Sequence, residues 1–219
     1  AEAHEQMDYA LEKGVNFIDA AELYPVPANA ETYGDTERII GNWLKKTGNR
    51  DKVVLASKIA GGGDYTAHIR KNGFSKKGIT EAIENSLKRL QTDYMDLYQL
   101  HWPSRGVNCF GVRDYPYKTA SKEAENHLEI LETLSDFIKQ GKIKHIGLSN
   151  ETPWGTMKYL QASEQYNLPK PVTIQNSYSL IHRGYEVGMS EVSMRENIGL
   201  LAYSPLAQGV LSGKYIDGN

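Results

Sequence analysis

The segments KVVLASK (residues 52–58), ITEAIENSLKRL (79–90) and MDLYQLHW (95–102) decide the fold of this chain. The first and third are short and mainly apolar without strict alternation, a pattern typical of parallel strands that are buried on both faces. In the middle segment apolar residues recur at steps of four, four and three, which places on one helix face Ile79, Ile83, Leu87 and Leu90. The stretch therefore predicts a strand, a helix and a second strand.

The same alternation extends in both directions along the chain. Four further strand-like runs lie at residues 15–21, 144–150, 172–179 and 199–206. Helical patterns separate the runs, and another helical pattern precedes the first run and ends at Gly14. One helix, five strand–helix units and a last strand are typical of an α/β protein with a parallel sheet. Because no linker divides the sequence, we expect a single domain over residues 1–219.

Two architectures fit this order: a doubly wound open sheet, and a (β/α)8 TIM barrel of which only part is present. The sequence lacks the phosphate-loop motifs of the nucleotide-binding open sheets. GGGD at 61–64 follows a predicted strand, but Thr66 stands where G-x-G-x-x-G requires glycine. The run GVLSGKY at 209–215 has too few residues between its glycines for a Walker A loop. Six strands cannot close an eight-stranded barrel, so the barrel interpretation requires an incomplete barrel.

The composition excludes several classes of partner. Lys and Arg number 25 against 27 Asp and Glu, so no basic field is available to attract nucleic acid or an acidic membrane surface. The apolar runs are far shorter than the roughly 20 residues that a membrane span needs. Cys109 is the single cysteine, and the six histidines show no paired spacing, so we expect neither a disulfide nor a metal. We expect a cytoplasmic protein; the pattern indicates no particular oligomeric state.

Polar side chains gather where the predicted strands end. Asp19 closes the first strand and Tyr24 follows five residues later, while Lys58 closes the second strand and His101 the third. Because the carboxyl ends of parallel strands meet at one edge of the sheet, we expect these four side chains to lie close together. Each residue alone has ordinary structural roles, and it is their combination that indicates chemistry.

The four groups together suit proton transfer to a carbonyl oxygen. The pKa of a free tyrosine is near 10, too high for easy acid–base chemistry at neutral pH. An ammonium group beside the phenol favours the phenolate, so Lys58 is expected to lower the pKa of Tyr24 while Asp19 keeps the lysine charged and oriented. His101 would orient the carbonyl through a hydrogen bond. Trp102, which follows directly, is expected either to line the substrate pocket or to serve in packing.

Several segments resemble the aldo-keto reductase family. In chain order they are GVNFIDAAELY (14–24), the lysine of VVLASK (53–58), DLYQLHWP (96–103), IGLSN (146–150), VTIQNSYSL (172–180) and LLAYSPLAQGVLSGKY (200–215). They run through almost the whole chain, and TERIIGNWL (36–44) and LSNETPWG (148–155) are most similar to the Tas-like branch, near the potassium-channel β-subunit-like reductases. The resemblance implies a (β/α)8 barrel, here with six of its eight strands, and NADP(H)-dependent reduction of aldehydes or ketones.

The resemblance also implies a catalytic role for each of the four residues at the strand ends. Tyr24 would be the general acid, and Lys58 would lower its pKa. Asp19 would pair with the lysine and lie near the nicotinamide ribose. His101 would orient the substrate carbonyl.

Further positions match cofactor contacts of the family. Ser149, Asn150 and Gln175 would hold the nicotinamide carboxamide, and the nicotinamide ring would stack on Tyr203. The stretch 204–214 matches the loop that covers the pyrophosphate, and its expected contacts are Ser204, Leu206, Gly209, Ser212 and Lys214.

Family members begin with a hairpin and a first barrel strand, and they end with a βα segment that holds the adenosine 2′-phosphate. We expect this chain to lack both parts, so it does not itself show a preference for NADP over NAD. A second function, a nucleotide-binding regulatory or redox-sensing subunit, would keep the same cofactor residues but turn over slowly. The substrate depends on the loops at 25–35, 60–77 and 103–125, whose sequence does not define a pocket shape.

Overall fold

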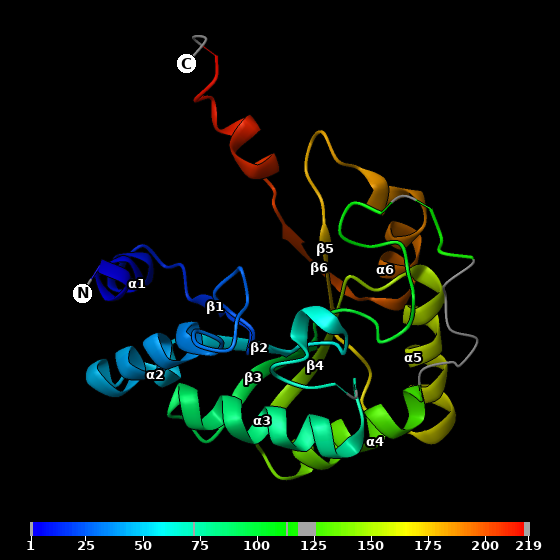
Figure 1. Cartoon of the computed structure of the whole chain (residues 1–219), viewed down its shortest axis with the longest axis horizontal. Helices are drawn as coiled ribbons and strands as arrows, with labels where there is room; N and C mark the ends of the chain where they lie inside the picture. The colour runs from blue at the N-terminus through cyan, green and yellow to red at the C-terminus, as the bar shows by residue number, and fades with distance from the viewer. Residues whose placement is uncertain (1, 72, 113, 118–125, 217–219) are drawn as a thin grey trace.

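The computed structural model describes residues 2–71, 73–112, 114–117 and 126–216. Within them, six strands form a single sheet (Figure 1). Each strand lies inside a predicted run or extends at most one residue beyond it. The strands are β1 (Phe17–Asp19), β2 (Val54–Ile59), β3 (Met95–Leu100), β4 (Ile143–Ser149), β5 (Thr173–Ser177) and β6 (Gly199–Tyr203).

In the same described residues, α-helices alternate with the strands along the chain. They are α1 (Glu2–Glu12), α2 (Asp35–Thr47), α3 (Lys76–Leu90), α4 (His127–Lys139), α5 (Pro153–Tyr166) and α6 (Met189–Glu196). This alternation confirms the predicted order of one helix, five strand–helix units and a last strand.

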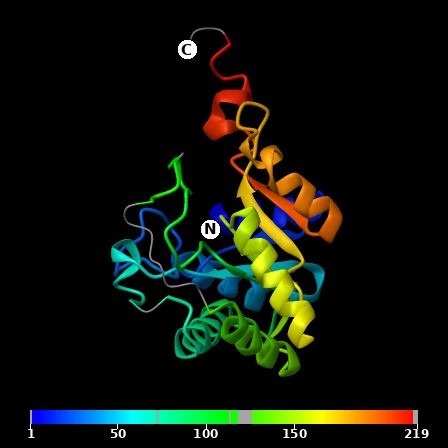
Figure 2. The same ribbon diagram turned by 90° about the vertical axis from the view of Figure 1, so that its right-hand side faces the viewer.

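The strand order separates the two predicted architectures. Neighbours in the sheet are consecutive in sequence, in the order β1-β2-β3-β4-β5-β6, and every pair is parallel. A doubly wound sheet reverses the direction of its strand order at a switch point, whereas here each new strand is added on the same side. The sheet curls, and helices cover its outer face (Figures 1 and 2), so the fold is the predicted α/β class, an incomplete (β/α)8 barrel.

The helices form where the sequence supplies caps and apolar faces. The Ser75 hydroxyl caps α3 by accepting the N–H of Gly78 at 3.2 Å, and Thr152 caps α5 by accepting that of Gly155 at 3.2 Å. Pro153 is the first residue of α5, where its missing N–H is not needed. The predicted apolar face of α3 is buried, namely Ile79, Ile83, Leu87 and Leu90.

The hydrophobic core lies between the outer face of the sheet and the helices. Trp43 of α2, Tyr98 of β3 and Leu131 of α4 are all fully buried in it. Side chains alternate along a strand, so Gln99 faces away from the layer that contains its neighbours Tyr98 and Leu100. The outer face of β3 is therefore apolar, while the concave face carries polar groups.

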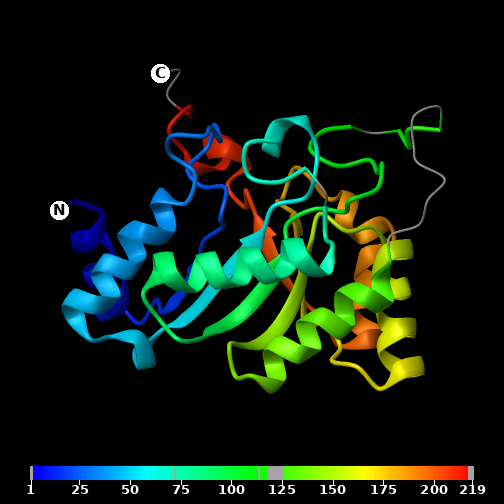
Figure 3. The same ribbon diagram turned by 60° about the horizontal axis from the view of Figure 1, so that its bottom comes forward.

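The loops that follow the strands lie at one end of the sheet (Figure 3), and the C-terminal segment projects away from it (Figure 1). The predicted loop 60–77 contains a short 3-10 turn at Asp64–Thr66 and ends where α3 begins. Of the predicted loop 103–125, residues 113 and 118–125 lie outside the described residues, as does residue 72 of the preceding loop. No helix in the described part of the chain combines the length and apolarity needed to cross a membrane.

Candidate active site

A buried lysine and a carboxylate meet at the carboxyl ends of β1 and β2. The Nζ of Lys58 lies 2.5 Å from Oδ2 of Asp19, and it donates a second hydrogen bond to the carbonyl oxygen of Ala20 at 2.8 Å. The lysine side chain is completely buried, whereas that of Asp19 is 28% exposed. Burial lowers the pKa of Lys58, and the Asp19 carboxylate opposes that shift. The predicted ion pair is present.

Two amide side chains complete the surroundings of Asp19. The Nε2 of Gln99 donates to Oδ1 at 2.8 Å, and the Nε2 of Gln175 donates to Oδ2 at 3.1 Å. The parallel register explains this convergence, because Lys58 pairs with Gln99 across β2 and β3. Gln175 is among the residues that the sequence predicts for the site, and Gln99 is not. The available signal was a polar residue inside a buried strand, two positions before His101.

Tyr24 and His101 join this pair. Beyond β1 the chain stays paired with β2, since the N–H of Glu22 donates to the carbonyl of Lys58 at 3.1 Å. It then turns so that the Tyr24 ring meets the His101 ring edge-on, with centroids 5.6 Å apart and planes at 81°. The Nζ of Lys58 is 5.1 Å from the centroid of the Tyr24 ring. The structure thus brings together all four predicted catalytic residues.

The pKa of Tyr24 shifts in the direction opposite to the sequence prediction. Burial, followed by the charge of Asp19 and then Tyr203, raises the pKa of Tyr24 to about 12. The expected lowering is wrong for this structure, because burial disfavours the charged phenolate and the carboxylate of Asp19 repels it. Tyr24 is therefore protonated at neutral pH, and as a weaker acid than free tyrosine it gives up its proton only to a strongly basic acceptor, such as a carbonyl oxygen that has gained negative charge.

His101 is a neutral imidazole in this environment. Burial, with a smaller contribution from the Lys58 charge, lowers the pKa of His101 well below its usual value of 6.5. Its Nδ1 is buried and has no hydrogen-bond partner among the described residues. A neutral ring offers one N–H donor, which suits a contact with a carbonyl oxygen.

The predicted nicotinamide-binding residues form a hydrogen-bonded group beside His101. The Asn150 side chain donates from Nδ2 to the carbonyl oxygen of His101 at 2.9 Å and accepts the Tyr203 hydroxyl at 2.7 Å. The Ser149 hydroxyl donates to the carbonyl oxygen of Gln175 at 2.9 Å. Asn150 adopts a left-handed conformation with φ of 54°, which asparagine tolerates better than most residues. The ends of β3, β4, β5 and β6 are thereby joined.

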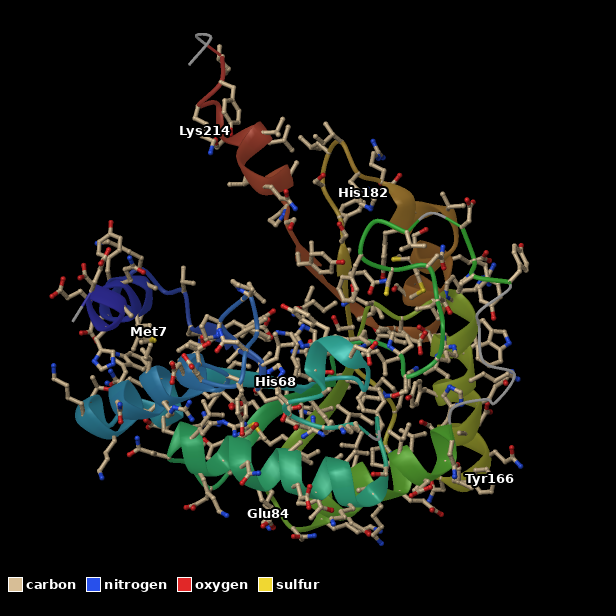
Figure 4. The ribbon with its side chains drawn as sticks, in the orientation of Figure 1. Met7, His68, Glu84, Tyr166, His182 and Lys214 are labelled. Atoms are coloured by element: carbon tan, nitrogen blue, oxygen red, sulfur yellow. The ribbon has the colours of Figure 1, made fainter. Side chains whose placement is uncertain are left out.

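The predicted pyrophosphate loop lies apart from this group. The chain turns outward after β6 and projects away from the sheet, with a 3-10 segment at Ala207–Ser212 (Figure 1) and Lys214 near its tip (Figure 4). Its contacts are local, since the Ser212 hydroxyl donates to the carbonyl oxygen of Gly209 at 2.6 Å. The structure does not bring the predicted contacts of this loop to the Asp19–Lys58 pair; they are Ser204, Leu206, Gly209, Ser212 and Lys214.

Trp102 packs beside the site. Its ring centroid lies 5.0 Å from that of His101, and Phe110 meets it edge-on at 5.9 Å. On its other side, Gly61 approaches so closely that a Cβ there would overlap the indole. Trp102 therefore packs against the loop that follows β2 and lies next to His101, and its place in a substrate pocket stays a prediction.

The curled sheet and its polar strand ends define the class of protein by its fold, a (β/α)8-type barrel that carries polar side chains at the carboxyl face of its strands. The model of the aldo/keto reductase family matches residues 1–219. The chain belongs to the aldo/keto reductase family, whose members are oxidoreductases.

Individual relatives agree with this assignment. Protein tas of Escherichia coli (strain K12) is 50% identical over 220 residues, which cover 100% of this chain and 63% of the relative. The "Uncharacterized oxidoreductase YrpG" of Bacillus subtilis (strain 168) is 36% identical over 218 residues, 97% of this chain and 60% of the relative. Norsolorinic acid reductase B of Dothistroma septosporum is 30% identical over 209 residues, 93% of this chain and 46% of the relative. The chain thus spans between 46% and 63% of the length of these relatives.

Proposed function

We propose that this chain carries the reaction centre of an NADP(H)-dependent carbonyl reductase, which converts aldehydes or ketones to alcohols. The observation that carries the proposal is the convergence of Tyr24, Lys58, Asp19 and His101 at one edge of the sheet. A protonated phenol and a neutral imidazole are the donors that a carbonyl oxygen requires as it gains negative charge. One relative is named norsolorinic acid reductase B, and a reductase among the relatives is consistent with the proposal.

The residues at the strand ends fit a nicotinamide nucleotide. Asn150 places an amide group just after β4 and Gln175 places one within β5, and the hydroxyl of Tyr203 is held by its hydrogen bond to Asn150. A fixed aromatic ring suits stacking on a flat heterocycle. These residues and Ser149 would hold the nicotinamide, which supplies a hydride when bound.

Residues of this chain would donate the proton and orient the oxygen that receives it. Tyr24 holds the proton that the reduced carbonyl oxygen must receive, and His101 orients that oxygen from the other side of the edge-on contact. Lys58 stays in place through its bonds to Asp19 and Ala20, and it provides positive charge next to the phenol after the proton has left. Gln99 holds the second carboxylate oxygen of Asp19, so the acidic side chain cannot rotate away from the lysine.

Oxidation of NADPH by the full-length protein, followed by absorbance with 4-nitrobenzaldehyde as the carbonyl, tests the proposal. Rapid turnover is the expected result. Tight NADPH binding with negligible turnover over a panel of aldehydes and ketones would contradict it and favour a nucleotide-binding regulatory or redox-sensing subunit. Absence of both binding and turnover would contradict the cofactor assignment as well.

The pH dependence of the reduction should respond to Asp19. Reduction needs the protonated phenol, so activity is complete below the pKa of Tyr24 and is lost as the pH rises through it. With the pKa of Tyr24 at about 12, the wild-type kcat should stay constant from neutral into moderately alkaline solution. The charge of Asp19 raises that pKa, so Asp19→Asn should move the alkaline decline to lower pH. Measured kcat–pH profiles in which the decline stays in place or moves upward would refute this role of Asp19.

A further inference from the structure

A second ion pair lies close to Tyr24 in sequence and is also buried. Glu22, two residues before Tyr24, is only 2% exposed. Both of its carboxylate oxygens face the guanidinium of Arg70: Oε2 accepts from Nη2 at 3.0 Å, and Oε1 accepts from Nη1. Oε1 also accepts the N–H of Ala60 at 2.6 Å. The Glu22 carboxylate thus accepts hydrogen bonds from two parts of the same loop, the backbone directly after β2 and the arginine ten residues further on.

This pair joins the loop that carries Tyr24 to the loop that follows β2. The second loop is itself folded, because the N–H of Arg70 donates to the carbonyl oxygen of Thr66 at 2.9 Å. Two more contacts connect the same loops. The N–H of Ala28 donates to the Tyr65 hydroxyl at 3.0 Å, and the ring of Tyr33 meets that of His68 edge-on at 5.9 Å. His68 is labelled on this loop in Figure 4.

We infer that Arg70 is a positioning residue for Tyr24: its two-pronged pair with Glu22 fixes the path of the chain out of β1 and so holds the phenol beside Lys58 and His101. The inference rests on the proposed function and extends it to a residue that does not touch the reacting atoms. A bidentate arginine–carboxylate pair determines orientation as well as distance. Displacing a reacting group by about 1 Å can slow a reaction by about a hundredfold.

The chain offers a matched ion pair at the opposite end of the sheet. Nη2 of Arg50 lies 2.8 Å from Oδ2 of Asp96, and this oxygen also accepts the N–H of Leu55 at 2.9 Å. Both pairs are thus mostly buried arginine–carboxylate contacts. In each pair the carboxylate also accepts a backbone N–H from β2 or from the residue that follows it. Asp96 lies at the start of β3, whereas the candidate active site lies at the strand ends. Arg50→Met therefore tests loss of a similar pair without displacing Tyr24.

The experiment compares Arg70→Met with Arg50→Met in the full-length protein. Both variants should lower the midpoint of thermal unfolding. Arg70→Met should also lower kcat for 4-nitrobenzaldehyde by about 10- to 100-fold, with the NADPH Kd and the aldehyde KM changed by less than about threefold. Arg50→Met should keep kcat within about twofold. Equal effects of the two variants on kcat, or an unchanged kcat in Arg70→Met, would overturn the inference.

Arg70→Lys provides a second test, again by its kcat, if the Arg70→Met protein does not fold. Lysine keeps the charge but cannot make the two-pronged contact, so we expect a folded protein with a kcat lowered by about threefold or more. Wild-type kcat in this variant would overturn the inference. Failure of the proposed function is distinguishable, because the wild-type protein would then show no carbonyl reduction at all.

Discussion

Tyr24→Phe should lower kcat for carbonyl reduction by about 10²- to 10⁴-fold, the range by which general acid catalysis accelerates reactions. Phenylalanine keeps the ring that lies 5.6 Å from His101, so the packing of the site should survive. Phenylalanine differs from tyrosine only in lacking the hydroxyl, so the substitution removes the proton donor and nothing else. Steady-state kinetics should show the loss in kcat, while NADPH titration should give a Kd within about threefold of wild type.

Tyr166→Phe is the matched control for this substitution. Tyr166 is the last residue of α5, is about half exposed and is labelled in Figure 4 far from the strand ends. Removing its hydroxyl should leave kcat within about twofold of wild type. A Tyr24→Phe protein that binds NADPH poorly and loses kcat only as a result would assign Tyr24 a structural role instead of proton donation.

Lys58→Met should have the second-largest effect, because it removes a completely buried charge from an ion pair. Asp19 would keep a carboxylate near the phenol without the ammonium that balances it. We expect kcat to fall by about a hundredfold or more, and the free energy of unfolding to fall by about 2–3 kcal/mol. The second value is below the usual cost of breaking a buried pair because Asp19 is 28% exposed and water can still reach it. Denaturant unfolding and steady-state kinetics measure the two effects separately.

A double variant separates stability from catalysis. Adding Asp19→Asn to Lys58→Met removes the unbalanced carboxylate while keeping its shape, so most of the lost stability should return. Activity should not return, since the positive charge beside the phenol is still missing. Recovery of kcat in the double variant would show that Lys58 acts only by neutralising Asp19.

Much of the fold is predictable from local patterns. Apolar runs and helix faces place the six strands and the face of α3, and Thr152 with Pro153 marks the start of α5. These features depend on residues within a few positions of one another, which a sequence displays directly. The choice between an open sheet and a barrel is different, because it depends on the order of strands in space. Local patterns fit both architectures, and only the resemblance to the aldo-keto reductases favours the barrel.

The candidate site was predictable in its residues and less so in its electrostatics. Asp19, Tyr24, Lys58 and His101 stand at strand ends, where the topology brings them together. The sign of the Tyr24 shift depends on which carboxylate neutralises which cation and on how much water is excluded, neither of which spacing reveals. The Glu22–Arg70 pair joins residues 48 positions apart in two irregular loops, so no periodicity points to it.

The sequential order of the strands bears on the folding pathway. Each strand pairs with the next one along the chain, so the sheet can grow by closing loops of moderate length. The hydrogen bond between Gln175 and Asp19 is an exception, since it spans 156 positions and needs β1 and β5 already in place. We therefore expect the candidate active site to be among the last parts of the described chain to assemble. During refolding, we expect the circular-dichroism signal of the helices to recover before enzymatic activity does. During synthesis, we expect a nascent chain to lack activity until β5 has been made.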